Sequence, residues 1–496
     1  MRPKIFTPVV VEIMLLFLAV CGSILLQTPS PLFVWSNTVV ISGQILFPAF
    51  CFILSFYYCD LYDLRIVRSF GEFLSRLPRA FGLTFILLYG FYALFPLMGI
   101  EAGPFFSSLL ISSVVLAVVL PVRWVLYSLL KLRSLTERVL ILGTSPLAWK
   151  IVEEIEATPH VGYAIIGLVE DRGASVSFAS PSSQYPLLGP LDRLADIVNE
   201  LRPDHIIVAL TERRGRLPVR DLLDARMAGI VVEDGIEVHE RLTEKLAIES
   251  LTPSFLFFSG DFTKSRFQMA LRRVVSLVFA LVGLVLTAPL MALIALAIKL
   301  DSYGPVFFVQ DRAGLRGRTF RLVKFRTMHP VPPGEEPGLV WERDVSSRVT
   351  RVGKWLRKLR LDELPQFNNI LRGDMDLVGP RPEIASNVKT MVEQIPYYSL
   401  RMVVRPGITG WAQVRHGYSV SQEDVTEKMR YDLYYVKHMS PWFDLRILID
   451  TVKIVLLGRD EEGKNRSEKK EADQQRTSPA IINFLQAEKP TRRGST

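Results

Sequence analysis

Two long stretches without charged residues constrain this chain more than any other feature. No Asp, Glu, Lys or Arg occurs in residues 13–59, and Glu101 is the only one in residues 80–122. Each stretch exceeds the roughly 20 apolar residues that span a bilayer, so the chain is predicted to be a membrane protein. The overall composition does not reveal these stretches, because charged residues make up an ordinary 22% of the 496 residues. The three cysteines lie in apolar segments without CxxC spacing, which excludes a structural zinc site and a disulfide framework.

The first 133 residues are predicted to form a bundle of four transmembrane helices, at about 8–27, 37–58, 80–99 and 105–130. Basic residues, which favour cytoplasmic loops, occur before the first helix, between the second and third, and after the fourth. They are Arg2, Lys4, Arg65, Arg68, Arg76, Arg79, Lys131 and Arg133. Both ends of the bundle are therefore predicted to be cytoplasmic. A cleavable signal peptide is the alternative for the first helix, but no small-residue cleavage site precedes the next apolar run.

A fifth apolar run covers residues 274–298 and is long enough to cross the membrane. Basic residues flank it on both sides, with Arg272 and Arg273 before it and Lys299 after it, which conflicts with a simple crossing. Pro289 lies near its middle, where it removes a backbone hydrogen bond and favours a bend. We predict a re-entrant helix that breaks at Pro289, dips into the cytoplasmic leaflet and returns; a kinked spanning helix is the alternative.

Residues 136–262 alternate short apolar runs with amphipathic ones, which predicts a parallel, doubly wound, Rossmann-like α/β domain. Strands are expected at 139–143, 164–169, 205–210 and 230–232, and helices at 146–157, 191–201 and 218–227. The turn after the first strand reads Gly143-Thr-Ser-Pro-Leu-Ala148, and a dinucleotide-binding turn would need a second glycine where Ser145 stands. A packing or regulatory domain is therefore favoured over a dinucleotide site.

Residues 301–458 contain 24 Lys plus Arg and 18 Asp plus Glu, and many of the basic residues lie in Gly- and Pro-containing turns. Fixed turns that present arginine suit a polyanionic ligand, because guanidinium binds phosphate through a bidentate fork. Nucleic acid is the competing ligand. The absence of a recognisable nucleic-acid-binding motif, and the apolar run just upstream, favour a small phosphorylated ligand and no nucleic acid.

The most informative run is residues 353–373, which contains the adjacent carboxylates Asp362 and Glu363. Asp362 suits a helix N-cap and Gly373 a helix end. Two carboxylates at the start of a helix would be favoured in the ionised form. An ionised aspartate can attack phosphorus as a nucleophile, and its neighbour can hold Mg²⁺ against a diphosphate. An N-cap followed by a surface glutamate is the other interpretation.

Several long motifs make residues 264–458 resemble the bacterial sugar transferase family, the monotopic polyprenyl-phosphate glycosyl-1-phosphate transferases. The matching segments are Lys299-Leu-Asp-Ser-Tyr-Gly-Pro-Val-Phe-Phe308, Lys324-Phe-Arg-Thr-Met328, Leu361-Asp-Glu-Leu-Pro-Gln366, Leu371-Arg-Gly-Asp-Met375, Val378-Gly-Pro-Arg-Pro382 and Arg405-Pro-Gly-Ile-Thr-Gly-Trp-Ala-Gln413. The whole architecture resembles the large members that start exopolysaccharide or O-antigen repeat units. The implied fold is α plus α/β, with a C-terminal monotopic α/β catalytic domain on the cytoplasmic face of the bacterial inner membrane.

The resemblance also implies an activity and its partners. Members transfer a sugar-1-phosphate from a UDP-sugar to undecaprenyl phosphate at the lipid bilayer and release UMP, with Mg²⁺ as cofactor. By resemblance Asp362 would form a covalent phosphosugar intermediate, and Glu363 would be catalytic and bind the metal. Arg357 and Arg381 would contact phosphate or nucleotide. Lys324 and Arg326 are further candidate substrate contacts. A homo-oligomer such as a dimer is expected.

Three further expectations concern single segments. The family's re-entrant helix often breaks at Ser-Pro, whereas this chain has Ala288-Pro289, so Thr287 would have to support the bend. A helix at 441–458 would carry Lys453 on a polar face and Val452 on an apolar one, which suits either a membrane interface or packing on the catalytic core. Residues 459–496 are predicted to form a disordered charged tail.

Two other functions compete with the transferase. A nucleotide-sugar dehydratase or epimerase would use the middle domain and bind a nicotinamide cofactor. A non-catalytic scaffold for polysaccharide assembly would only bind lipid or partners through residues 301–458.

Overall fold

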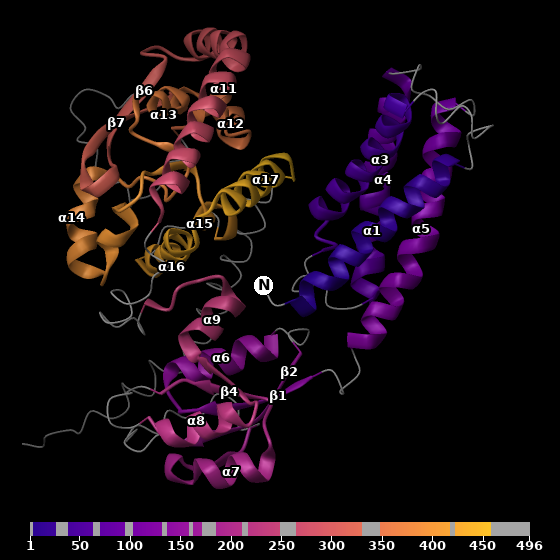
Figure 1. Cartoon of the computed structure of the whole chain (residues 1–496). Coiled ribbons are helices and arrows are strands. Elements are labelled where there is room, and N and C mark those ends of the chain that lie inside the picture. The colour runs from indigo at the N-terminus through magenta and orange to yellow at the C-terminus, as the bar shows by residue number, and fades with distance from the viewer. Residues whose placement is uncertain are drawn as a thin grey trace, which may run out of the picture. The chain divides into compact units, whose positions relative to one another are not determined.

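The computed structural model forms two compact units, Met1–Thr243 and Glu244–Thr496, which are described separately (Figure 1). The described residues are 3–25, 38–62, 70–94, 103–130, 136–157, 162–170, 185–210, 217–248, 264–329, 348–416 and 422–457. The predicted tail at 459–496 lies outside them.

Four apolar helices begin the first unit: α1 (Pro3–Leu25), α3 (Thr38–Tyr58), α4 (Phe70–Leu94) and α5 (Gly103–Leu130). They share one hydrophobic core, in which Phe52, Phe56 and Phe73 are completely buried. Helix α4 begins earlier than the predicted residue 80, because Phe73 and Leu77 continue its buried stripe beneath the charged side chains of that turn. In the described residues, Phe70–Leu94 and Phe105–Ser128 are long and apolar enough to cross a membrane, while Val11–Ile24 and Gly43–Tyr58 are shorter apolar helices.

A buried ion pair lies inside this apolar core. The guanidinium of Arg123 on α5 makes two contacts with the carboxylate of Glu12 on α1, at 2.7 and 2.9 Å. Arg123 is 1% exposed and Glu12 is 2% exposed. Arg123 also donates a hydrogen bond of 2.8 Å to the carbonyl of Leu61, just after α3. One guanidinium therefore fastens α1, α5 and the end of α3 together.

The rest of the first unit is a parallel α/β domain, as predicted. Its strands are β1 (Glu137–Leu142), β2 (Tyr163–Glu170), β3 (Leu187–Pro190), β4 (His205–Val208) and β5 (Val231–Asp234). All neighbouring strands are parallel, in the order β3-β2-β1-β4-β5. The helices are α6 (Pro146–Ala157), α7 (Leu194–Leu201, after the short 3-10 turn Leu191–Arg193), α8 (Val219–Met227) and α9 (Gly235–Thr243). The short strand β3 and helix α9 were not predicted.

The turn after β1 packs closely against the end of β4. Gly143 has a φ of +108°, and a Cβ there would lie 2.6 Å from the carbonyl oxygen of Ala209. The Ser145 hydroxyl donates to that same oxygen at 2.6 Å and accepts from the backbone N–H of Ala148 at 3.1 Å. Ser145 thus caps α6 and joins it to the end of β4, at the position where a dinucleotide-binding turn has glycine.

The second unit contains the long helix α11 (Arg266–Asp301), the antiparallel hairpin β6 (Phe307–Ala313) and β7 (Thr319–Phe325), and the parallel pair β8 (Asp376–Val378) and β9 (Gly407–Thr409). The 3-10 turns are η7 (Leu315–Gly317), η8 (Leu361–Gln366) and η9 (Tyr398–Met402). The remaining helices are α12 (Arg351–Lys358), α13 (Phe367–Arg372), α14 (Ala385–Gln394), α15 (Trp411–Arg415), α16 (Gln422–His438) and α17 (Pro441–Leu457). The completely buried Trp411 lies in the main core, with the ring of Phe443 4.9 Å away.

Helix α11 differs from its prediction in one respect. Residues on both sides of Pro289 belong to one continuous helix rather than to two helices separated by a non-helical break. The Thr287 hydroxyl donates to the carbonyl of Gly283 at 2.7 Å. It therefore does not replace the hydrogen bond that Pro289 removes, which belongs to the carbonyl of Val285. The loss of a single hydrogen bond is compatible with a continuous helix, since proline bends helices more often than it divides them.

Helix α17 confirms the predicted element but not the predicted polar face. Ile447 is completely buried in the core, and Lys453 is buried as well. Trp442, Leu445 and Val452 are exposed. One side of α17 therefore packs on the domain, and the other presents apolar side chains at its surface.

Candidate active site

The two predicted carboxylates lie inside a short 3-10 turn, η8. The N-cap of this turn is Arg360, in the left-handed conformation with φ +56°, and not Asp362 as predicted. Asp362 and Glu363 occupy its first turn, and both side chains are buried. Helix α13 follows directly and ends at Gly373 in the left-handed conformation with φ +94°, as predicted. The expected single helix is thus a 3-10 turn followed by an α-helix.

Glu363 is held by two cations from different elements. Lys324 of β7 donates to its Oε1 at 2.7 Å, and Arg381 from the loop after β8 donates to the same oxygen at 3.1 Å. Burial by itself would raise the pKa of this carboxyl, but Arg381 and Lys324 outweigh burial and lower the pKa to about 2. Glu363 is therefore an anion at any physiological pH.

Asp362 has the opposite character. Burial, and then the neighbouring negative charge of Glu363, raise its pKa above the ordinary value of 3.8, against the attraction of Lys324, Arg381 and Arg357. The expectation that the helix start would favour its ionised form was wrong in direction, because the sequence does not reveal burial. Burial, followed by repulsion from Arg381, also lowers the pKa of Lys324.

Arg357 reaches the site from α12, which packs unusually tightly. A Cβ on Gly353 would lie 2.1 Å from the carbonyl oxygen of Thr327, so only glycine allows this approach. The Thr350 hydroxyl caps the helix by accepting from the N–H of Gly353 at 2.9 Å. Arg357 Nε then donates to the hydroxyl of Thr327 at 2.9 Å, which fixes the guanidinium beside the carboxylates.

Two motifs that are far apart in the sequence meet in the backbone around Arg381. The N–H of Gly379 donates to the carbonyl of Thr409 at 2.9 Å, and the N–H of Gly407 donates to that of Pro380 at 3.0 Å. A Cβ on Gly407 would lie 2.1 Å from the nitrogen of Gly379. The glycines of both motifs are therefore required where the parallel strands β8 and β9 and the segments next to them lie close together.

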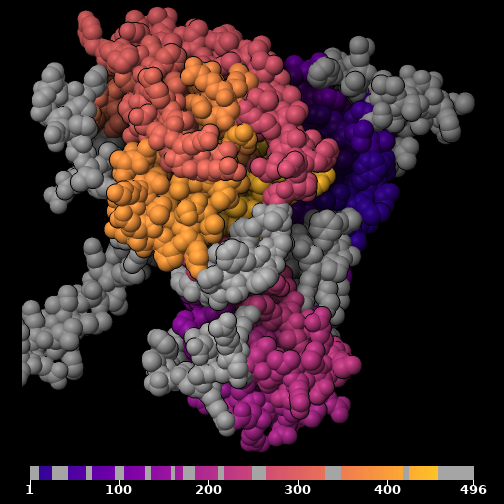
Figure 2. Space-filling view, turned by 60° about the vertical axis from the view of Figure 1, so that its left-hand side comes forward, coloured from indigo at the N-terminus to yellow at the C-terminus, as the bar shows by residue number. Residues whose placement is uncertain are grey.

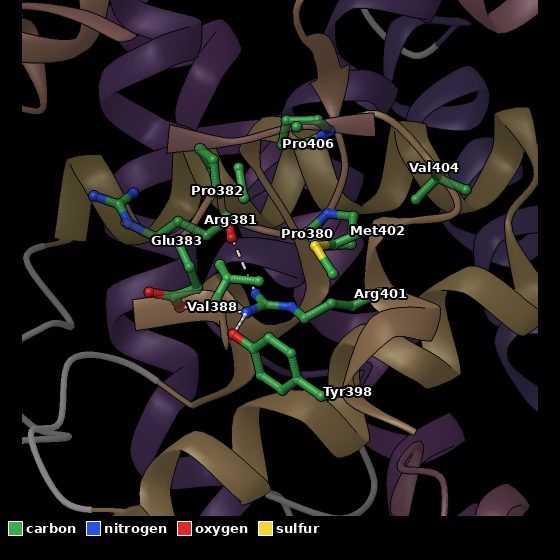
Figure 3. Close-up of a pocket in the computed structure, with 12 residues that line it drawn as sticks. Pro380, Arg381, Pro382, Glu383, Val388, Tyr398, Arg401, Met402, Val404 and Pro406 are labelled. Atoms are coloured by element: carbon green, nitrogen blue, oxygen red, sulfur yellow. Dashed lines mark hydrogen bonds and ion pairs between the residues drawn. The ribbon is translucent and has the colours of Figure 1, made fainter. Parts of the chain in front are cut away.

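A buried arginine that the sequence did not mark holds the backbone of Arg381 in place. Arg401 of η9 donates to the carbonyl of Arg381 at 3.0 Å and to the hydroxyl of Tyr398 at 2.5 Å (Figure 3). It also forms an ion pair of 2.7 Å with the buried Asp432 of α16. No motif marks Arg401, and only its burial beside an acidic partner identifies it as part of the site.

Arg326 lies apart from the carboxylates. Its terminal nitrogens donate to the carbonyl of Ser302 at 2.8 Å, to the hydroxyl of Ser302 at 2.9 Å and to the carbonyl of Tyr303 at 2.5 Å. These bonds attach the end of α11 to the segment after β7. Arg326 therefore stabilises the fold, whereas Lys324, two residues earlier, contacts Glu363.

The carboxylates suit a magnesium ion that is shared with a ligand. Mg²⁺ prefers carboxylate oxygens and is often held by one or two of them together with substrate phosphates. Across the described part of the chain, no group of three or more His, Cys, Asp or Glu side chains is arranged to hold a metal. Asp362 and Glu363 are the adjacent carboxylates that could hold such an ion.

These contacts bring two adjacent buried carboxylates together with basic side chains, in a domain that carries a long apolar helix. The sequence model for "Bacterial sugar transferase" matches residues 267–458, and the model for "CoA-binding domain" matches residues 58–222. The chain belongs to the bacterial sugar transferase family.

Three curated relatives illustrate the similarity. The chain is 42% identical over 239 residues to a UDP-N-acetylgalactosamine-undecaprenyl-phosphate N-acetylgalactosaminephosphotransferase of Aeromonas hydrophila, covering 48% of this chain and 55% of the relative. It is 32% identical over 345 residues to an undecaprenyl-phosphate glucose phosphotransferase of Komagataeibacter xylinus, covering 68% and 62%. It is 44% identical over 187 residues to a UDP-glucose:undecaprenyl-phosphate glucose-1-phosphate transferase of Caulobacter vibrioides, covering 37% and 69%. The matched regions thus span little more than half the length of the first two relatives.

Proposed function

We propose that this chain transfers a sugar-1-phosphate from a UDP-sugar to undecaprenyl phosphate and releases UMP, as the first membrane step of exopolysaccharide or O-antigen synthesis. The observation that carries the proposal is the pair Asp362–Glu363, with Glu363 fixed by Lys324 and Arg381. The family membership and the names of the relatives support the same donor and acceptor classes.

The adjacent carboxylates take different tasks. Asp362, whose pKa is raised, is the more basic of the two and therefore the better nucleophile. A carboxylate oxygen of Asp362 attacks the phosphorus that carries the sugar, the bond from that phosphorus to UMP breaks, and UMP leaves with its electron pair. An oxygen of undecaprenyl phosphate then attacks the same phosphorus, and the aspartate is released unchanged.

The basic residues neutralise the charge that gathers during these steps. Lys324, Arg357, Arg360 and Arg381 surround the two carboxylates and give the site a net positive charge for a diphosphate. Among the described residues, Arg357 bonds only through Nε, to Thr327, so its two terminal nitrogens are available there for a bidentate phosphate contact. Glu363 would hold Mg²⁺ together with the diphosphate, and the ion would supply further stabilisation of the phosphate charge.

The second unit also presents an apolar surface that suits a membrane. Most large side chains of α11 are exposed, including Val274, Phe279 and Leu286, and α11 lies among the pink to coral residues on the surface in Figure 2. Exposed Trp442 and Leu445 on α17 add to this apolar surface. We infer that a bilayer covers it, with α11 as a re-entrant membrane helix and the domain on the cytoplasmic face of the inner membrane.

Release of UMP by the purified chain tests the proposal directly. With undecaprenyl phosphate, Mg²⁺ and each of UDP-glucose, UDP-galactose and UDP-N-acetylgalactosamine as donors, we expect one donor at least to yield UMP. Asp362→Asn should abolish release and Arg381→Ala should reduce it at least about tenfold, since a charge-assisted contact to the reacting phosphate is lost. Asp311→Asn, an exposed aspartate on β6, is the matched control and should stay at the wild-type rate.

Mass spectrometry separates the two-step mechanism from direct transfer. Wild-type protein mixed with the productive donor alone should carry a phosphosugar on Asp362. Full UMP release by Asp362→Asn would contradict the covalent mechanism, and no release by the wild type with any UDP-sugar would contradict the activity.

A further inference from the structure

A cavity lies beside the η8 turn, with Arg360, Glu363 and Leu364 in its wall. It has a volume of about 100 Å³. Its walls come from five elements and include Leu364 of η8, Phe367 of α13, Ile408 of β9, and Ile454 and Val455 of α17. Charged side chains line only one end, where Glu363 and Arg360 lie. The cavity thus has a polar end at the catalytic carboxylates and an apolar body that leads away from them.

The polar side chains along the body of the cavity already bond to the protein. The hydroxyls of Thr409 and Thr451 lie 2.7 Å apart, and Thr451 donates to the carbonyl of Ile447 at 2.7 Å. The Gln413 side-chain nitrogen donates to the carbonyl of Ile408 at 3.1 Å, while its buried oxygen has no hydrogen-bond partner among the described residues. One free acceptor is too little for a buried sugar or nucleotide base, whose several polar groups would each need a partner. The apolar side chains that form most of the wall suit an apolar ligand.

Two residues of the cavity wall pack on the helix that presents the apolar surface. A Cβ on Gly283, in the middle of α11, would lie 2.9 Å from the ring of Phe367, so this ring packs directly on α11 and also lines the cavity. Leu364 packs against the cluster of Ile294 and Ile298 on the same helix. A hydrocarbon chain lying along α11 would therefore meet the cavity on its way to the carboxylates.

We propose that this cavity holds the first isoprene unit of the polyprenyl phosphate acceptor, the unit next to the phosphate. The phosphate would lie at the end formed by Arg360 and Glu363, beside Asp362. The cavity is smaller than the apolar cavity of about 150 Å³ that binds benzene, so it has room for no more than one isoprene unit. This inference rests on the proposed function and adds a binding site for its acceptor.

Filling the cavity tests the assignment. Ile454→Trp places a large ring inside it, whereas Val452→Trp places the same ring on the exposed side of α17. With Ile454→Trp we expect the KM for both undecaprenyl phosphate and geranyl phosphate to rise at least about tenfold, because excluding two buried carbon atoms already costs that much affinity. Binding of the UDP-sugar without lipid should stay unchanged in both variants, and Val452→Trp should keep the wild-type KM.

The outcomes distinguish this inference from the proposed function. If the wild type uses no polyprenyl phosphate at all, the proposed function is wrong. If the wild type uses it and Ile454→Trp keeps the wild-type KM for both lipids, only the cavity assignment is wrong.

A second measurement does not depend on a folded variant. Wild-type protein is irradiated with geranyl phosphate that carries a diazirine on its first isoprene unit. Label on peptides from residues 407–415 or 441–457 is expected. Label confined to α11 would overturn the assignment.

Discussion

Two neighbouring carboxylates in one turn acquire different acidities from the side chains around them. Glu363 touches two cations, and Asp362 is buried with fewer direct partners. In the proposed mechanism, Glu363 remains anionic while Asp362 keeps enough basicity to bond to phosphorus. The proposed roles of nucleophile and charged neighbour rest on these contacts.

The pH dependence of UMP release should report this division. Since the pKa of Asp362 is raised, the nucleophile is protonated, and activity lost, at a higher pH than for an ordinary aspartate at 3.8. Since the pKa of Lys324 is lowered, its charge is lost, and activity falls, at a lower pH than the ordinary 10.5. The initial rate of UMP release at saturating donor, plotted against pH, should therefore give a bell-shaped curve. Its acid and alkaline midpoints should lie closer together than the ordinary pKa values of 3.8 and 10.5.

Lys324→Arg isolates the alkaline side of that profile, because arginine stays charged throughout the range. The alkaline limb of this variant should move to higher pH while its acid limb stays in place. An unchanged alkaline limb would show that another group controls it.

The sequence identified this pair of carboxylates but not their acidities. The motif around Asp362 and Glu363 is readable because residue types and spacing carry it. Burial depends on β7, α12 and the loop after β8, which approach η8 only in the folded domain. A prediction from the local helix start therefore gave the wrong pKa direction for Asp362, although the direction for Glu363 was right.

At the level of elements, strands and helices with clear periodicity were predicted well. Four of the five parallel strands lie at predicted places, whereas β3 (Leu187–Pro190) is too short and too Pro- and Gly-rich to show alternation. The start of η8 was misplaced because Arg360 adopts a left-handed conformation that no residue preference favours for arginine. Local rules fail where tertiary contacts set the backbone.

The pairing of η9 with α16 gives a prediction about stability. Asp432→Asn leaves the buried Arg401 without its closest anion, and breaking such a pair costs roughly 3–5 kcal/mol. We expect a clear fall in the melting temperature of the purified full chain, together with slower UMP release as the Arg381 loop loses its support.

Glu383→Gln is the matched control, because Glu383 is a more exposed and more distant partner of Arg401 at 3.4 Å. It should lower the melting temperature much less. Equal effects of the two substitutions would contradict the special role assigned to Asp432.

For the whole molecule, composition alone located the apolar helices and the basic catalytic region. It could not decide the course of α11, because length favours a crossing while the basic flanks oppose it. The structure adds that both ends of α11 contact the same domain. Arg273 donates to Asp376 at 2.9 Å near one end, and Asp301 accepts from the N–H of Val352 at 3.1 Å at the other.

These two contacts lead to the topology prediction. A helix that crossed the bilayer would place one of them within or beyond the hydrocarbon, where the polar groups around it would be costly to bury. We therefore expect both ends of α11 to face the cytoplasm. With Cys21, Cys51 and Cys59 replaced by alanine, the exposed residues Gln268 and Tyr303 are changed to cysteine one at a time. A membrane-impermeant maleimide should label both only after the inner membrane is opened, and labelling of Tyr303→Cys in intact spheroplasts would establish a spanning helix instead.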